Sequence, residues 1–412
     1  MAPANVIGFD EALASVSTHA ENLHPPESEA LPLLECRDRI LAESISADRD
    51  QPPFDRSTRD GYAIRSADLQ DGRDLKLVGQ VRAGERWSGS PLEPGSAISI
   101  MTGAPVPEGA DAVVMVEHVE RSGGTIRVAD ERIVRTGDNI VPRGAEAQAG
   151  DALLAAGTML EGAEIALAAA CGCSSLSVYR RPRVAIVATG DELVELDQTP
   201  DEQQIRNSNS YGLAALIARA GGEAVRLPIA PDRREELERI IQEARASDLV
   251  LLSGGVSMGE YDLVEEVLLS LGAEFFFTGV RMQPGKPVVF GRLPASGDTP
   301  ARFFFGLPGN PVSTQVTFHC FVEPLLRAIS GAAMQGPRFV QATLEEDVAG
   351  KAGLMRILPA RLTSGRVTPT VRLVGWQGSG DLAANARANC YAVLPPERER
   401  FAAGDVITIL LR

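Results

Sequence analysis

The sequence predicts a multidomain α/β plus β protein, built around a doubly wound, mostly parallel α/β domain. Three observations carry this prediction. The 412 residues suffice for roughly two to four domains of about 150 residues each. Hydrophobic residues make up 44% of the chain, which excludes a disordered protein. The hydrophobic pattern has a period of two from about residue 75 to residue 135, and from residue 183 apolar strands alternate with amphipathic helices.

Charge and cysteine content narrow the function classes. The net charge of −15 argues against a nucleic-acid binder, because binding to phosphates depends on Lys and Arg, and an anionic membrane surface would repel the chain too. No apolar run approaches the ~18–20 residues that span a bilayer, and the N-terminus lacks the pattern of a secretory signal. Five sparse cysteines do not form a disulfide framework. We therefore expect a cytoplasmic protein with no nucleic-acid and no membrane partner.

The first 180 residues combine helical segments with an all-β one. Phe9–Ala20 carries apolar side chains at helical spacing, and the Ala-rich Glu161–Cys173 predicts a second helix. Short runs of alternating polarity, separated by Gly and Pro, predict a small β-rich domain between them. These runs are Leu75–Val78, Ala97–Ile100, Ala112–Val116, Thr125–Val128 and Arg132–Val134.

From residue 183 onward, strands alternate with helices, as a doubly wound sheet requires. The expected strands are Val184–Ala188, Ala224–Ile229, Leu249–Leu252, Glu274–Val280, Val288–Phe290 and Phe303–Phe305. The expected helices are Asn207–Ala220, capped by Ser208 or Asn209, and Arg233–Ala246, Glu260–Leu271 and Val312–Ile329. The last segment, from about Gly336, returns to short β runs and predicts a small β-barrel or sandwich.

Glycine-rich loops follow three of the expected strands. They are Thr189–Glu192, Ser253–Ser257 and Gly306–Ser313. In open α/β sheets, ligands bind beyond the carboxyl ends of the strands, where backbone N–H groups and helix N-termini favour an anion. For any one loop alone, a tight strand-to-helix turn is the better explanation. Several such loops at one edge predict a phosphate or oxyanion site.

Carboxylates and one lysine lie beside these loops. The acids are Asp191, Glu192, Asp232, Glu260 and Asp262. Acids next to an anion site predict a bridging Mg²⁺, which is commonly held by one or two carboxylates and substrate phosphate. The structural alternatives are an N-cap for Asp232 and a favourable first-turn charge for Glu260 and Asp262, and the first-turn alternative is stronger for Glu260 than for Asp262. Lys286 is placed to reach an oxyanion, or is an ordinary solvated lysine.

Other familiar chemistries lack their motifs. Gly285-Lys286 is followed by Pro287, which excludes a P-loop, and no GxGxxG opens the α/β region. Cys171 and Cys173 are separated by a single residue, Gly172, and they lack the further ligands that a zinc site needs. No Cys–His or Ser–His arrangement suggests a covalent nucleophile.

A polar segment outside the α/β region is a further candidate for contact with a ligand or partner. Phe54 and Tyr62 flank a stretch dense in polar groups, with an expected turn at Asp60-Gly61. Contact with a ligand or partner and a purely structural role explain this segment equally well.

Six motifs follow one another along the chain. They are PPFDRSTRDGYA (52–63), IMTGAPVPEGADAVVMVE (100–117), ATGDEL (188–193), SGGVSMGEYD (253–262), QPGKP (283–287) and GLPGNPVS (306–313). In this order they resemble the molybdopterin molybdenumtransferase family, which is related to the E domain of gephyrin. The resemblance covers essentially the whole chain, and the combination is highly specific.

The resemblance implies an elongated homodimer with four domains per subunit. A mixed linker domain spans residues 1–46 and 141–180, a β-rich domain 47–140, the molybdopterin-binding α/β domain 181–332 and a C-terminal small β-barrel 333–412. The implied reaction takes adenylylated molybdopterin and molybdate, inserts molybdenum at the dithiolene and releases AMP, with Mg²⁺ required. Implied partners are molybdopterin adenylyltransferase and downstream molybdoenzymes or their chaperones. A non-catalytic scaffold, a pterin carrier and a tungstate-preferring variant remain as alternatives.

The resemblance also implies site residues, each at a position of this sequence that matches a family motif. The implied catalytic residues are Asp60, Thr102, Asp232, Asp262 and Lys286, and the implied metal ligands are Asp191, Glu192 and Asp262. The implied substrate-binding residues are Ser253, Gly254, Gly255, Ser257, Pro308, Gly309, Asn310, Pro311, Arg356 and Ser379. Two positions depart from the family pattern: Gln283 stands where Lys is frequent, which removes one cation, and Glu146 stands where Asp is frequent.

Overall fold

The computed structural model describes residues 5–21, 23–69, 73–129, 132–255, 263–333 and 335–412. The chain falls into two compact units. The first comprises Met1–Ala42, Gly157–Glu161 and Ser175–Arg412, and the second comprises Glu43–Ala156 and Gly162–Ser174. The finer division into four domains stays a prediction. No helix in the described ranges is long and apolar enough to cross a membrane.

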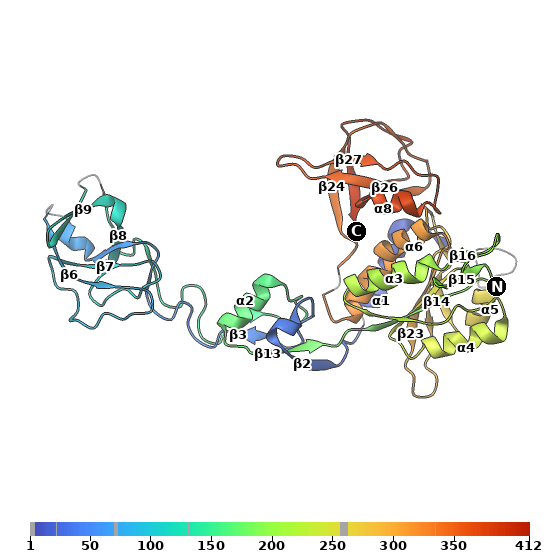
Figure 1. The fold of residues 1–412 in the computed structure, drawn as a ribbon, viewed down its shortest axis with the longest axis horizontal. Coiled ribbons are helices and arrows are strands. Elements are labelled where there is room, and N and C mark those ends of the chain that lie inside the picture. Colours follow the sequence, from blue (N-terminus) through green and yellow to red (C-terminus); the bar gives the residue numbers. More distant parts are fainter. Residues whose placement is uncertain (1–4, 22, 70–72, 130–131, 256–262, 334) are drawn as a thin grey trace. The chain divides into compact units, whose positions relative to one another are not determined.

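A six-stranded sheet lies at the centre of the α/β part of the first unit (Figure 1). Its strands, in spatial order, are β17 (Glu223–Arg226), β14 (Arg183–Ala188), β18 (Leu249–Ser253), β23 (Arg302–Leu307), β22 (Val289–Leu293) and β19 (Glu274–Phe277). The first four are parallel, and β22 runs antiparallel to both of its neighbours. The predicted mostly parallel sheet is confirmed.

Helices cover both faces of this sheet. One core contains residues of α1 (Phe9–Ala20), α3 (Ser208–Arg219), α6 (Pro311–Thr317) and α7 (Glu323–Ile329), and the other contains residues of α4 (Arg234–Ala244) and α5 (Leu263–Ser270). Successive residues of β14 alternate between them: Val184 and Ile186 belong to the first core, and Ala185 and Val187 to the second. This alternation explains why the strand is apolar at every position.

Two helix predictions need correction, and the start of a third lies outside the described ranges. Asn207, rather than Ser208 or Asn209, caps α3, because its side-chain oxygen accepts a hydrogen bond from the Ser210 N–H at 3.2 Å. The helix expected over Val312–Ile329 is interrupted by a π-helical turn, Phe318–Val322, between α6 and α7. The helix expected from Glu260 is described from Leu263, since residues 256–262 lie outside the described ranges.

Smaller pairings complete this part of the fold. The strand expected over Glu274–Val280 is divided into β19 and β20 (Gly279–Val280), and β20 pairs with β1 (Val6–Ile7). Near the start of the α/β region, β2 (Ser28–Pro32) and β13 (Ser175–Tyr179) form an antiparallel ribbon.

The C-terminal strands close into a five-stranded barrel. Around it lie β26 (Met355–Thr363), β27 (Thr370–Leu373), β24 (Phe339–Leu344), β30 (Val406–Leu411) and β28 (Cys390–Leu394), and β26 pairs with both β27 and β28. The short β21 (Met282–Gln283) adds to β26 and places Gln283 opposite Arg356. Helix α8 (Leu382–Arg387) joins the barrel to α6, because the Asn385 side chain donates to Gln315 at 2.8 Å.

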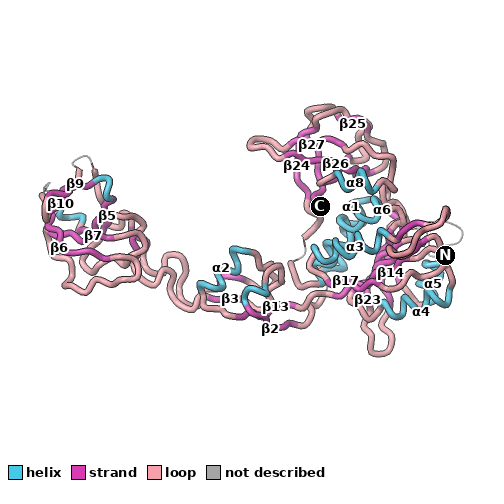
Figure 2. The backbone as a smooth tube through the Cα atoms, viewed as in Figure 1, coloured by secondary structure: helices cyan, strands magenta, loops and turns pink. Residues whose placement is uncertain are grey.

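The second unit contains the predicted β-rich segment together with helix α2 (Gly162–Ala170) (Figure 2). Its main sheet has the order β8 (Ala112–Met115), β5 (Gly61–Ile64), β7 (Ser96–Ile100), β6 (Leu75–Val81), β10 (Thr125–Val128) and β9 (Val119–Ser122). Two ribbons pair β3 (Ile45–Ser46) with β12 (Ala152–Leu154) and β4 (Arg56–Ser57) with β11 (Ile140–Val141), and α2 (Gly162–Ala170) is the predicted Ala-rich helix. The strand expected at Arg132–Val134 is wrong, since these residues have no regular structure. Gly61 starts β5 rather than a turn, and β9 was not predicted.

Candidate functional site

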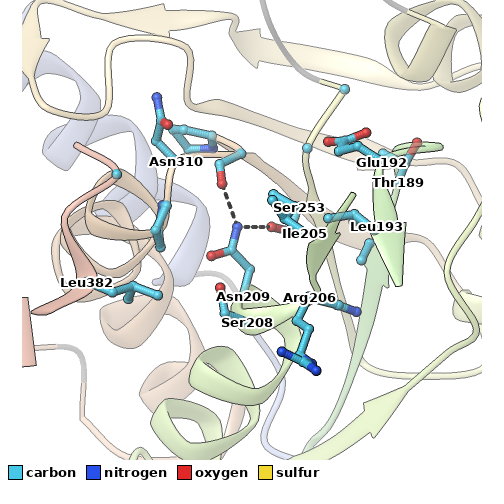
Figure 3. Close-up of a pocket in the computed structure, with 18 of the residues that line it drawn as sticks. Thr189, Glu192, Leu193, Ile205, Arg206, Ser208, Asn209, Ser253, Asn310 and Leu382 are labelled. Atoms are coloured by element: carbon cyan, nitrogen blue, oxygen red, sulfur yellow. Dashed lines mark hydrogen bonds between the residues drawn. The ribbon is translucent and has the colours of Figure 1, made fainter. Parts of the chain in front are cut away.

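The loops after three adjacent parallel strands, β14, β18 and β23, line one cavity of about 630 Å³ (Figure 3). The start of α3 and the segment before and within α8 complete its walls. The lining residues that the sequence analysis proposed are Glu192, Ser253, Gly254, Gly255, Pro308, Gly309, Asn310 and Pro311. The three glycine-rich loops therefore meet at one edge of the sheet, as predicted.

Backbone conformation requires glycine after β18. Gly254 and Gly255 have φ angles of +94° and +63°, which L side chains rarely adopt. A Cβ on Gly254 would lie 2.6 Å from the carbonyl oxygen of Thr189, and one on Gly255 would lie 2.7 Å from a methyl carbon of Val264. The two glycines therefore let the β14 and β18 loops approach one another closely beside the cavity.

A side-chain amide links three walls of the cavity. The Asn209 Nδ2 atom donates to the Ser253 Oγ at 3.0 Å and to the Gly309 carbonyl oxygen at 2.8 Å (Figure 3). These residues belong to the first turn of α3, the end of β18 and the loop before α6. The amide therefore fixes the three segments relative to one another.

The predicted acids form a chain of contacts at the end of β14. The Asp191 carboxylate accepts a hydrogen bond from the Asp232 N–H at 3.1 Å, and the Asp232 carboxylate accepts one from the Thr189 hydroxyl at 2.9 Å. Thr189 and Glu192 both line the cavity. The N-cap role considered for Asp232 is wrong: α4 begins at Arg234, and its N-cap position is Arg233. Asp232 instead bonds to the loop that lines the cavity.

The described acids suit a magnesium ion that is completed by substrate. No three His, Cys, Asp or Glu side chains converge as a metal site within the described ranges. Asp262 and Ser257, which the sequence analysis placed in the site, lie outside those ranges. Carboxylate oxygens are hard donors, and Mg²⁺ is commonly held by one or two of them with substrate phosphate and water. The Glu192 carboxylate lines the cavity and suits that mode of binding, whereas Asp191 is not among the lining residues and accepts from the Asp232 N–H.

The cations near the cavity differ from the predicted ones. Lys286 is exposed and does not line the cavity, whereas its neighbour Pro287 does. Arg206, in β16 (Ile205–Arg206), lines the cavity and was not predicted. It reaches this place because β16 pairs in parallel with β15 (Leu193–Val194), which begins at the last residue of the ATGDEL motif.

Neither of the two predicted residues from the C-terminal region lines the cavity. Arg356 donates from Nη1 to the Ala349 carbonyl oxygen at 2.6 Å, while its buried Nε has no partner among the described residues. Burial lowers the pKa of the Arg356 guanidinium. The Ser379 carbonyl accepts a hydrogen bond from the Val312 N–H at 2.9 Å, and the next residue, Gly380, lines the cavity.

The second unit contains the remaining predicted residues. The Asp60 carboxylate accepts two hydrogen bonds from Thr102, from the backbone N–H at 2.7 Å and from the hydroxyl at 2.8 Å. These bonds hold the pKa of the Asp60 carboxyl below its ordinary value. Glu146, one of the two departures from the family pattern, forms an ion pair with Arg56 at 2.7 Å.

Three family models match successive regions of the chain. Residues 7–172 match the MoeA N-terminal region (domain I and II), residues 185–328 a probable molybdopterin binding domain, and residues 341–411 the MoeA C-terminal region (domain IV). A molybdopterin molybdenumtransferase from Nostoc sp. is 37% identical over 393 residues, which cover 93% of this chain and 88% of that protein. The chain belongs to the molybdopterin molybdenumtransferase family.

Further relatives agree with this membership. The molybdopterin molybdenumtransferase of Haemophilus influenzae is 36% identical over 395 residues, 93% of this chain and 94% of that protein. A crystal structure of a molybdopterin biosynthesis moeA protein from Pyrococcus horikoshii OT3 superposes with a TM-score of 0.78 at 28% identity, covering 99% of this chain and all of that one.

In this molybdenumtransferase family member, most of the cavity lining lies in the region that matches the molybdopterin binding domain. The sequence analysis missed Arg206 and Asn209 there. Arg206 lies just before α3 and Asn209 lies in its first turn, where a polar residue is equally consistent with a helix cap, so no local signal pointed to a site role. Gly380 and Leu382 enter from the part matching the MoeA C-terminal region.

Proposed function

We propose that this family member inserts molybdenum from molybdate into adenylylated molybdopterin and releases AMP. The observation that carries the proposal is the meeting of three glycine-rich strand-end loops around one cavity, in the region that matches a molybdopterin binding domain. Backbone N–H groups of such loops and the N-terminus of α3 suit phosphate oxygens.

The chain's own residues would divide the work as follows. The Ser253 hydroxyl and the Gly255 N–H offer donors to a phosphate, whereas the Gly254 N–H is bonded to the Leu307 carbonyl at 3.2 Å. Thr189 and Asp232 fix the neighbouring loop. Arg206 and Lys286 supply positive charge that two anionic substrates need in a protein of net charge −15.

Magnesium is part of the proposal. Glu192 and Asp191 would hold the ion, together with Asp262, which lies outside the described ranges. When bound, Mg²⁺ supplies neutralisation of phosphate charge. Asp60 and Thr102 are proposed as further catalytic residues on the resemblance of their motifs. We also propose a cytoplasmic homodimer that receives its pterin from an adenylyltransferase and passes the product to molybdoenzymes or their chaperones.

A matched pair of variants tests the metal assignment. Glu192→Gln removes a charge from the cavity lining, whereas Glu195→Gln changes an acid of the same loop that binds the Tyr211 hydroxyl and Arg226 instead. We expect E192Q to lower AMP release by roughly 100-fold at low Mg²⁺ and to recover in part at high Mg²⁺. E195Q should keep an unchanged Mg²⁺ dependence. If both variants respond alike, Glu192 is not a metal ligand.

A further inference from the structure

We propose that Asn209 is a positioning residue: it holds the Ser253 hydroxyl so that its proton points into the cavity, toward an anionic oxygen of the substrate. The inference deepens the proposed function and rests on it for the identity of that substrate. Ser253 was assigned through its motif, whereas no motif drew attention to Asn209.

The acceptor chemistry determines how the Asn209 amide is oriented. A carbonyl oxygen can only accept, so the atom 2.8 Å from the Gly309 carbonyl must be the amide nitrogen and not the amide oxygen. An amide nitrogen carries two protons. The second proton is directed to the Ser253 Oγ, 3.0 Å away.

This orientation decides what the Ser253 hydroxyl can do. Because its oxygen accepts from Asn209, its own proton is directed away from that amide and is available to another acceptor. No described residue accepts that proton, and Ser253 lines the cavity although it is only 2% exposed. A ligand oxygen in the cavity is therefore the natural acceptor.

Helix capping does not account for Asn209. The cap of α3 is Asn207, whose side chain accepts from the Ser210 N–H, so Asn209 is not needed to begin the helix. A purely structural role, which links α3 to the loop before α6, would require only the hydrogen bond from Asn209 to the Gly309 carbonyl. The second bond, to Ser253, is what couples the amide to the binding surface.

A double-mutant cycle on kcat/KM for the adenylylated pterin tests the coupling. Ser253→Ala should lower kcat/KM by roughly 10- to 100-fold, the usual effect of losing a hydrogen bond to a charged group. Asn209→Ala should lower it by roughly tenfold in the wild-type background and by less than about twofold in S253A, because the hydroxyl it positions is then absent. Equal factors in both backgrounds would show that Asn209 acts only on the structure and would overturn the proposal.

Asn209→Asp provides a second, sharper variant. A carboxylate can only accept, so it would draw the Ser253 proton away from the cavity and face the Gly309 carbonyl unfavourably. We expect N209D to lower kcat/KM more than N209A, and to lose this excess in the S253A background. An N209D variant with the activity of N209A would contradict the proposed direction of the hydroxyl.

A measurement without ligand separates this proposal from the proposed function. The side-chain amide signal of Asn209 can be identified in ¹⁵N spectra by its loss in N209D. In S253A, one of its two protons should exchange faster with solvent while the other, bonded to Gly309, stays unchanged. No change in either proton would overturn the positioning role even if the wild type releases AMP. A wild type that releases none, but shows the change, would refute the proposed function and leave the Asn209–Ser253 link standing.

Discussion

Thr102 donates both its backbone N–H and its hydroxyl to the same carboxylate oxygen of Asp60, at 2.7 and 2.8 Å. Strands β5 and β7 bring the two residues together, because Gly61 pairs with Ile100. Both bonds favour the ionised carboxylate and hold its pKa below the ordinary value. Asp60 is therefore a fixed negative charge at neutral pH rather than a proton donor.

Thr102→Val should raise the pKa of Asp60, since the backbone donor remains and the hydroxyl is lost. Thr102→Ser keeps the hydroxyl and should leave the pKa close to that of the wild type. Titration of the Asp60 carboxyl carbon by NMR measures both. If T102V leaves the pKa unchanged, the hydroxyl does not contribute to the ionised state.

Asp248 should contribute to the stability of the α/β part of the fold. Its carboxylate accepts from both Nη atoms of Arg180 at 2.7 and 2.9 Å and from the Arg183 N–H at 2.8 Å, and Arg302 lies 3.5 Å away. Burial alone would raise the pKa of Asp248, but these hydrogen bonds and charges hold it below its ordinary value. Asp248→Asn should therefore lower the free energy of unfolding by about 2 kcal/mol at pH 7.

The pH dependence of this effect has a defined sign. A carboxyl whose folded-state pKa is depressed stabilises the fold above its unfolded pKa of about 3.9, and this contribution is lost as the pH falls through the lower folded value. The difference between wild type and D248N should shrink below about pH 4. Thermal melting across pH measures it, and Asp298→Asn, at an exposed loop position, is the control. A difference that stays constant down to acid pH would contradict the ionic account.

Two neighbouring glycines of the cavity should respond differently to alanine. Gly254→Ala places a Cβ 2.6 Å from the Thr189 carbonyl oxygen at a φ of +94°, so it should destabilise the protein by about 2 kcal/mol. Gly309→Ala meets its nearest described atom, the Gly254 Cα, at 3.7 Å and should leave stability almost unchanged. The melting temperatures of the two variants, each compared with that of the wild type, test this expectation. Equal shifts would show that the close approach of the loops is not rigid.

The proposed contact of Lys286 with an anionic substrate can be tested by chemical labelling, because the chain has three lysines and all are exposed. Adenylylated molybdopterin with molybdate should slow acetylation of Lys286 if its ammonium binds an anion. Lys76 and Lys351 serve as controls in the same sample, and mass spectrometry separates the three positions. Equal rates with and without substrates would remove Lys286 from the site.

Local patterns predicted the scaffold of the cavity well. The apolar run at Val184–Ala188 identifies a strand covered on both faces, and the glycines after β18 mark a turn with positive φ. Parallel strands then bring their loops to one edge whatever the details of packing. The placement of Glu192 and Ser253 at a common cavity follows from these rules together.

The remaining site features could not be predicted from the sequence, because they depend on pairings between residues far apart in the chain. Arg206 reaches the cavity through the pairing of β16 with β15, and Asn209 acts across to Gly309, one hundred residues away. Neither contact leaves a local trace, since a polar residue at a helix start is equally consistent with a cap. The π-helical turn at Phe318–Val322 was missed for a related reason: all five of its residues are buried, as they would be in a regular buried helix.

The most direct test of the central claim is AMP release from adenylylated molybdopterin, with and without molybdate, in Mg²⁺ buffer, with the pterin product analysed for molybdenum. The account predicts molybdate-dependent release of AMP and one molybdenum bound per pterin released. Pterin that binds without AMP release, or AMP release without molybdenum on the product, would contradict it.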